Sequence, residues 1–409
     1  MKTEVQQLKP ALRFPEFEGE WVETKLGNIS TFSKGKGVSK KDIEAKGKNE
    51  CIRYGELYTK YREVIEVIVS KTNIEISESI LSEKNDVIIP SSGETQLDIA
   101  TASCVLKNGV ILGGDLNIIR SNVNGVFLSY LLNNNRKKEI ARLAQGNSVV
   151  HLYNKQLATL KINLPKSNEQ QKIASFLTTI DSRIQALEKK KSSLEQYKKG
   201  VMQKIFTQEI RFKDEDGKDF PEWEEKKLGE VALTPEYGMN SAAKKFDGKH
   251  KYLRITDIDE ITQTFKPNPL TSPSGGIDEK YLLREGDLVF ARTGASVGKS
   301  YLYNPKDGEL YFAGFLIRFR INNALPKYIF YQTQSYYYRK WVSVYSMRSG
   351  QPGINANEYK SITIPLPSLA EQTHITNFLT AIDKKIALVN EQIEKTKAYK
   401  KGLLQKMFV

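Results

Sequence analysis

Residues 162–206 read INLPKSNEQQKIASFLTTIDSRIQALEKKKSSLEQYKKGVMQKIF, and residues 364–408 read IPLPSLAEQTHITNFLTAIDKKIALVNEQIEKTKAYKKGLLQKMF. The two stretches share Glu-Gln, Phe-Leu, Ile-Asp and Tyr-Lys-Lys-Gly at one constant offset, so that Glu169 corresponds to Glu371. Apolar residues recur at alternating steps of four and three, which indicates a helix with one apolar face. Each helix follows a proline that blocks helical structure upstream. The sequence therefore predicts two long helices.

The apolar positions form a coiled-coil seam along each helix. An exposed helix alone could not hide such a stripe, so we expect the two helices to pair with each other. The alternative is that each helix packs only on its own globular body. Lys191, Lys198 and Lys400 also occupy seam positions, where they either fix the register or face a partner, or simply extend their stems to solvent. The predicted apolar seam consists of Ile173, Leu177, Ile180, Ile184 and Leu187 in the first helix and Ile375, Leu379, Ile382, Ile386 and Val389 in the second.

The whole chain is one unit written twice. The segment Trp21-Val-Glu-Thr-Lys-Leu-Gly27 matches Trp223-Glu-Glu-Lys-Lys-Leu-Gly229 at the same offset, whereas the sequences between these anchors and the helices diverge. A period of this length indicates a domain duplication, not a solenoid. If a pseudo-two-fold axis relates the halves, the helices run antiparallel and the C-terminus lies near the N-terminal body. The expected class is α+β, with mixed α/β bodies at 1–166 and 209–368 and spacer helices at 167–208 and 369–409.

Composition excludes several classes of protein. The chain has 409 residues, 39% of them hydrophobic, which is enough for two or three folded domains. Two cysteines and three histidines do not support a disulfide framework or a metal centre. No stretch approaches the roughly 20 apolar residues of a membrane span, so we expect a cytoplasmic protein without membrane contact. The formal net charge of +14 is compatible with a nucleic-acid partner.

A catalytic motif is hard to find. The segment Arg292–Ser300 ends like a phosphate-binding loop, but three residues separate Gly294 from Gly298 where such a loop needs four. We therefore interpret it as a loop that contacts nucleic acid or as a plain turn. We expect no catalytic residue and no metal site, and a chain of this size without such motifs is typical of a binding component.

Candidate DNA contacts lie on turn-like segments that mix Lys and Arg with Ser, Thr and Gln. Lys and Arg suit phosphates, whereas Ser, Gln and Arg can also read base edges. The two long helices carry half of the net charge, so the bodies have no overwhelming basic patch. The candidates are Lys34, Lys36, Lys40, Lys41, Ser91, Ser92, Thr95, Gln96, Lys244, Lys245, Arg292, Thr293, Lys299, Arg348, Ser349 and Gln351.

The anchors together resemble a known family. FPEF-x-G-x-W-x-x-x-x-LG at Phe14–Gly27, DFPEWEEKKLG at Asp219–Gly229, the joints IxLPxxxEQxxIxxFLxxxD and the terminal YKKGxxQKxF closely resemble the specificity subunit of type I restriction–modification enzymes. The resemblance implies two target-recognition domains, each reading one half of an asymmetric, interrupted site in double-stranded DNA. It also implies helices that set the spacing and dock two modification subunits, with restriction or translocase subunits beyond them. S-adenosylmethionine, ATP and Mg²⁺ would then belong to those subunits, and this chain would hold no cofactor.

Three alternatives remain open at this point. The chain could serve a related system whose nuclease and methylase share one polypeptide. It could hydrolyse nucleotides with the loop at 294–300, or act as a purely structural coiled-coil adaptor. The bases of each half-site cannot be read from the sequence.

Overall fold

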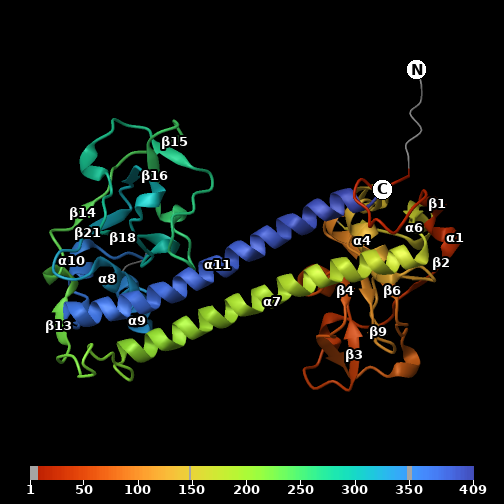
Figure 1. The fold of residues 1–409 in the computed structure, drawn as a ribbon, viewed down its shortest axis with the longest axis horizontal. Coiled ribbons are helices and arrows are strands. Elements are labelled where there is room, and N and C mark those ends of the chain that lie inside the picture. Colours follow the sequence, from red (N-terminus) through yellow and green to blue (C-terminus); the bar gives the residue numbers. More distant parts are fainter. Residues whose placement is uncertain (1–7, 147–148, 348–351) are drawn as a thin grey trace. The chain divides into compact units, whose positions relative to one another are not determined.

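The computed structural model describes residues 8–146, 149–347 and 352–409 of the chain (Figure 1). It divides into two compact units. Unit 1 runs to Lys189 and takes in Asn390–Val409, and unit 2 comprises Lys190–Val389. Helices α7 (Ser167–Phe206) and α11 (Leu369–Met407) each contribute one part to unit 1 and one part to unit 2. Each unit is therefore a mixed body with two helix segments, which confirms the predicted α+β class.

The central sheets of the two units share the order of their first four strands, and the sheet of unit 1 has a fifth strand at one edge. In unit 1 the order is β2-β10-β6-β8-β4, and in unit 2 it is β14-β21-β18-β19. The middle strands, Asp-Val-Ile-Ile-Pro in β6 and Asp-Leu-Val-Phe-Ala in β18, are buried at every position, because other strands flank them and helices cover them. The strands are β2 (Ser30–Lys34), β10 (Leu116–Ser121), β6 (Asp86–Pro90), β8 (Ser103–Val105) and β4 (Val64–Ile65), then β14 (Glu236–Tyr237), β21 (Leu316–Arg320), β18 (Asp287–Ala291) and β19 (Ser300–Leu302).

A short two-stranded sheet closes each body. Strand β1 pairs antiparallel with β12, and β13 pairs antiparallel with β22, so the start of each body is tied to its last strand. Pro165 and Pro367 end those last strands, and a long helix begins two residues later in each unit. The bounds are β1 (Val22–Lys25), β12 (Lys161–Leu164), β13 (Glu224–Lys227) and β22 (Thr363–Leu366).

The remaining elements cover the sheets or form small satellite sheets. The helices are α1 (Leu26–Ile29), α2 (Tyr54–Thr59), α3 (Gln96–Ile99), α4 (Gly125–Asn134), α5 (Lys137–Leu143), α6 (Asn154–Ala158), α8 (Pro326–Gln332), α9 (Tyr336–Ser346) and α10 (Ala356–Lys360). The other strands are β3 (Asn49–Ile52), β5 (Ser70–Thr72), β7 (Ser92–Gly93), β9 (Ile111–Leu112), β11 (Val150–His151), β15 (Ala243–Lys245), β16 (Lys251–Leu253), β17 (Thr271–Pro273) and β20 (Leu310–Phe312). No helix in the described ranges combines the length and the apolar character needed to cross a bilayer.

The repeated Glu of each joint ties the helix start to its body. In unit 2 the buried Glu371 accepts hydrogen bonds from Arg211 Nη2 at 2.9 Å and from Trp223 Nε1 at 2.9 Å. In unit 1 Glu169 accepts the equivalent bonds from Arg13 and Trp21. A carboxylate in the first helical turn also interacts favourably with the helix dipole. This triad explains why Trp and Glu recur in both copies.

Replacing Glu371 with Gln should lower the free energy of unfolding by about 2 kcal/mol, because hydrogen bonds to a charged group are lost from a buried site. The matched control is Glu222→Gln, since Glu222 lies 3.5 Å from the same guanidinium but its side chain is 92% exposed. That change should cost less than about 0.5 kcal/mol. Urea unfolding of the two variants measures the difference. Equal losses would mean that the buried carboxylate contributes no more than the exposed one.

Most of the seam residues are part of the apolar core of one unit. Eight of the ten are buried, and Leu187 and Ile386 are half-buried. In unit 1 the first turns of α7 share one apolar cluster with the body, with Leu403 and Met407 of α11, and with Phe408, which directly follows α11. In unit 2 the first turns of α11 share a cluster with the body and with the last turns of α7. The alternative that each helix packs only on its own body is therefore wrong.

Two of the three seam lysines form the same arrangement in the two units. In unit 1 Lys400 Nζ lies 2.8 Å from Asp181 and 5.1 Å from the centre of the Tyr130 ring, and the Tyr130 hydroxyl donates to Asp181. Burial raises the pKa of Tyr130, so its hydroxyl stays protonated as a donor. In unit 2 Lys198 Nζ lies 2.7 Å from Asp383, over Tyr331. Each lysine joins one helix to the other and to the body, which favours register fixing over a simple exposed stem.

The helix segments run antiparallel within unit 1. Asp181 of α7 pairs with Lys400 of α11, and the later Glu188 pairs with the earlier Lys397. The end of α11 lies beside α4, where Phe408 packs on the aromatic rings of the N-terminal body (Figure 1). The prediction that the C-terminal helix returns to this body is confirmed.

Candidate nucleic-acid interface

Two loops of the candidate interface occupy the same place in the two units. Residues 91–102 connect β6 to β8 in unit 1, and residues 292–299 connect β18 to β19 in unit 2. Each connects two neighbouring antiparallel strands. A phosphate-binding P-loop instead leads from a strand into a helix whose N-terminus faces the phosphates. The nucleotide-hydrolysing alternative therefore does not fit the loop at 294–300.

Eight of the thirteen predicted contact residues that the structure describes are exposed. Lys299 is half-buried and lies 3.9 Å from Glu260, and Thr95 caps α3 by accepting a hydrogen bond from the Asp98 amide. Ser91 and Ser92 are buried, so their part is to shape the loop. Among the predicted contact residues, Arg292 and Thr293 are half-buried. The predicted contact residues with exposed side chains are Lys34, Lys36, Lys40, Lys41, Thr95, Gln96, Lys244 and Lys245. Arg348, Ser349 and Gln351 lie outside the described residues.

The same backbone framework surrounds one corner of each sheet. The amide of Ser91 donates to Asp115 O at 2.7 Å, and the Leu152 amide donates to Ser91 O at 3.0 Å. In unit 2 the Arg292 amide donates to Phe315 O at 3.0 Å, and the Ile354 amide donates to Arg292 O at 2.9 Å. Ser91 and Arg292 are therefore structurally equivalent.

The edge strands β2 of unit 1 and β14 of unit 2 are each followed by a glycine, and these two glycines are equivalent. A Cβ on Gly35 would lie 2.0 Å from Gly113 O, and one on Gly238 would lie 2.2 Å from Ala313 O, so only glycine fits this close approach. Lys34 and Tyr237 immediately precede these glycines and are equivalent in turn. The first residues before α6 and α10, Tyr153 and Asn355, complete the set. We call these residues the framework corner, which consists of Lys34, Ser91 and Tyr153 in unit 1 and of Tyr237, Arg292 and Asn355 in unit 2.

Each framework corner holds one cation over one tyrosine ring. In unit 1 Lys34 Nζ lies 5.5 Å from the centre of the Tyr153 ring. In unit 2 the guanidinium carbon of Arg292 lies 4.9 Å from the centre of the Tyr237 ring. Sequence reasoning missed Tyr153, Tyr237 and Asn355. The offset between equivalent residues drifts by a residue within the variable bodies, so neither comparing the copies nor any local motif could have found them.

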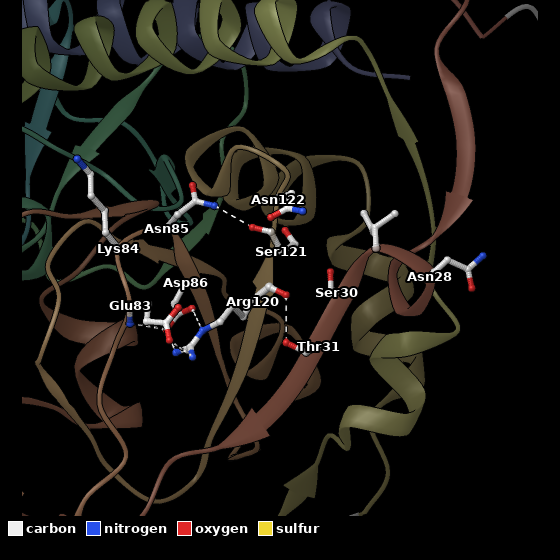
Figure 2. A pocket seen from close by; sticks show the side chains of 11 residues that line it. Asn28, Ser30, Thr31, Glu83, Lys84, Asn85, Asp86, Arg120, Ser121 and Asn122 are labelled. Atoms are coloured by element: carbon white, nitrogen blue, oxygen red, sulfur yellow. Dashed lines mark hydrogen bonds and ion pairs between the residues drawn. The ribbon is translucent and has the colours of Figure 1, made fainter.

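A wide, shallow pocket of about 770 Å³ lies near the other end of β6 (Figure 2). Two of its charged groups bind each other: Arg120 Nε and Nη2 each lie 2.8 Å from an oxygen of Asp86. The hydrogen bond to Asp86 raises the pKa of Arg120. The same pair recurs in unit 2 as Arg320 and Asp287, 2.8 Å apart. We interpret it as a structural ion pair at the sheet edge.

The described part of the chain offers little for metal or thiol chemistry. No group of three His, Cys, Asp or Glu side chains within it could bind a metal ion. Cys51 and Cys104 are buried, and burial raises the pKa of the Cys104 thiol to about 12. A thiol with such a pKa is not a nucleophile at neutral pH.

The fold and the framework corners define a class of protein: two similar bodies, each joined to a long helix, that present different side chains at equivalent loops. Comparison with known proteins adds the family. The family model described as type I restriction modification DNA specificity domain matches residues 18–196 and 221–398. The chain belongs to this family.

Relatives agree along nearly the full length. The chain is 27% identical to the type I restriction enzyme MjaVIII specificity subunit of Methanocaldococcus jannaschii, over 94% of this chain and 91% of that protein. It is 21% identical to the EcoKI specificity subunit of Escherichia coli, over 94% and 87% of the two chains. Among solved structures, the S subunit of a type I restriction–modification system from M. genitalium aligns with a TM-score of 0.64 at 16% identity, covering 98% of this chain and 99% of that one. A chain from a structure on complex assembly and conformational transition of the type I R-M system aligns with a TM-score of 0.55 at 18% identity, covering 96% and 98%.

Proposed function

We propose that this chain is the sequence-recognition subunit of a type I restriction–modification complex, and that each body reads one half of an asymmetric, interrupted DNA target. The observation that carries the proposal is the duplication itself. The two bodies share a backbone framework down to single hydrogen bonds, but they present different side chains at the framework corners. Two copies of one scaffold with different recognition loops read two different half-sites, whereas a symmetric dimer reads a palindrome.

The long helices provide the surface for partner subunits in this proposal. Tyr197 and Tyr399, equivalent residues of α7 and α11, are 55% and 58% exposed. Three residues on, Gly200 and Gly402 would each accept a Cβ with nothing within 4 Å in the described chain. Glycine inside a helix costs about 1 kcal/mol relative to alanine, so contacts within the chain do not explain these residues. A modification subunit that docks closely on each exposed Tyr–Gly face would explain why these residues are glycines. Two such faces would accommodate two modification subunits.

The chemistry belongs to those partners. We infer that adenine methylation with S-adenosylmethionine, and translocation and cleavage with ATP and Mg²⁺, take place on the modification and restriction subunits. This chain would contribute recognition and spacing only.

Co-expression with a modification subunit, followed by mapping of methylated adenines in host DNA, tests the proposal. We expect methylation at one interrupted, asymmetric motif that disappears when this chain is omitted. Affinity of the complex for that DNA should fall steeply with added salt, because phosphate contacts release counterions. A complex that assembles but methylates no motif would support the adaptor alternative instead.

A further inference from the structure

We infer that the framework corner of each body specifies one base of its half-site, and that Arg292 in unit 2 reads a guanine there. The inference rests on the proposed function and narrows it to a residue. Its basis is the position of the Arg292 guanidinium. Backbone hydrogen bonds hold Arg292, the Tyr237 ring lies beneath the guanidinium, and a hydrogen bond from the Ala356 amide holds that ring.

The backbone of Arg292 is held on both sides. Its amide donates to Phe315 O and its carbonyl accepts from the Ile354 amide, so the loop cannot swing the residue away. The guanidinium carbon lies over the Tyr237 ring, 4.9 Å from its centre, and the Tyr237 hydroxyl accepts a hydrogen bond from the Ala356 amide at 3.2 Å. The ring is therefore a fixed platform, and much of the entropy that an arginine loses on binding is lost before DNA arrives.

A guanidinium held over a ring face by cation–π attraction keeps its N–H donors available for other acceptors. Within the described part of the chain, no residue accepts a hydrogen bond from the Arg292 side chain, and the side chain is half-buried, not covered. Two parallel N–H donors of one guanidinium match the O6 and N7 acceptors of guanine in the major groove.

The corner of unit 1 is built to read differently. Ser91 takes the place of Arg292, and its buried side chain cannot reach outward. The cation comes instead from Lys34, stacked over Tyr153, which is 46% exposed. A lysine ammonium is a point charge without the arginine fork. The two corners therefore impose different base preferences from equivalent places.

The test uses the full complex with its modification subunit, and compares the methylated motifs of the wild type and Arg292→Gln. We expect Arg292→Gln to relax or change one guanine position in one half of the motif, with about a 10- to 100-fold loss of preference there. The spacer, the other positions and the whole other half should be unchanged. The matched control is Lys244→Gln, which removes an exposed cation from β15 in the same unit and should weaken methylation without changing any base.

Three results would overturn the inference. The motif of Arg292→Gln could be unchanged, the changed position could be something other than guanine, or an intact Arg292→Gln complex could lose methylation at all sites alike. If Arg292→Gln fails to assemble, Tyr237→Leu decides, because it removes the platform and keeps the arginine; relaxation at one guanine supports the inference, and no change overturns it. A wild-type complex without any motif would instead contradict the proposed function.

Discussion

Replacing Phe408 with alanine should destabilise unit 1, although Phe408 lies at the opposite end of the sequence from most of that unit. Its side chain is 5% exposed, and its ring centre lies 5.5 Å from that of Phe127 and 6.3 Å from that of Trp21. Removing a buried phenyl ring costs about 3–5 kcal/mol, because the lost apolar burial adds to the cavity left behind. The same change should weaken the nearby hydrogen bond from the Leu12 amide to Lys406 O, which is 2.8 Å long.

Hydrogen exchange of the wild-type and variant chains measures this effect locally. Amides of β6 and α4 should exchange faster in Phe408→Ala, and amides of β18 and α8 should not change. The matched control is Phe206→Ala at the equivalent position of α7. Phe206 is only half-buried against Tyr328 of unit 2, so we expect a smaller loss of about 1–2 kcal/mol, confined to unit 2. If only the last turns of α11 respond to Phe408→Ala, the helix end frays independently and does not stabilise the body.

The repeated positions of the sequence predicted the fold because they make the contacts that both units need. Glu169 and Glu371 each bind a Trp and an Arg, and the glutamines that follow them bind the carbonyl oxygens of Pro165 and Pro367. A side chain with such a set of partners tolerates little change, so both copies keep it. The helices were readable for a simpler reason, since their apolar period is a local property of the sequence.

The framework corners could not be predicted from the sequence, because their residues are distant in the sequence and differ between the two copies. Arg292 and Tyr237 are 55 positions apart, and a sheet edge brings them together. The residues that differ between the copies are those whose side chains the scaffold does not need, so no periodicity marks them. The predicted loop at 91–96 illustrates the limit: its composition suits DNA contact, yet the structure buries Ser91 and Ser92. The assignment of contacts from the sequence therefore stays a prediction until a base is tested.

Replacing Asp181 with alanine should also lower the free energy of unfolding of unit 1 strongly. The equivalent Asp383 of unit 2 provides a comparison within the same chain. Lys400 then keeps Glu63, at 3.3 Å, as its carboxylate partner, and the Tyr130 hydroxyl loses its acceptor. The side chains of Asp181 and Lys400 are 10% and 14% exposed, so water compensates little, and we expect a loss of about 3 kcal/mol. In the equivalent pair of unit 2, Asp383 is 40% exposed, and Asp383→Ala should cost no more than about 1 kcal/mol.

A double-mutant cycle separates the ion pair from the other contacts of Asp181. Lys400→Met keeps most of the apolar stem and removes the charge, so Asp181→Ala combined with Lys400→Met should recover part of the loss seen for Asp181→Ala. Hydrogen exchange in unit 1 gives the free energies of all three variants. Additive losses would mean that the two groups do not interact, and that the apolar seam alone sets the register. Recovery in the double variant would show that the lysine needs its partner, and would explain why a charge stands at the same seam position in both helices.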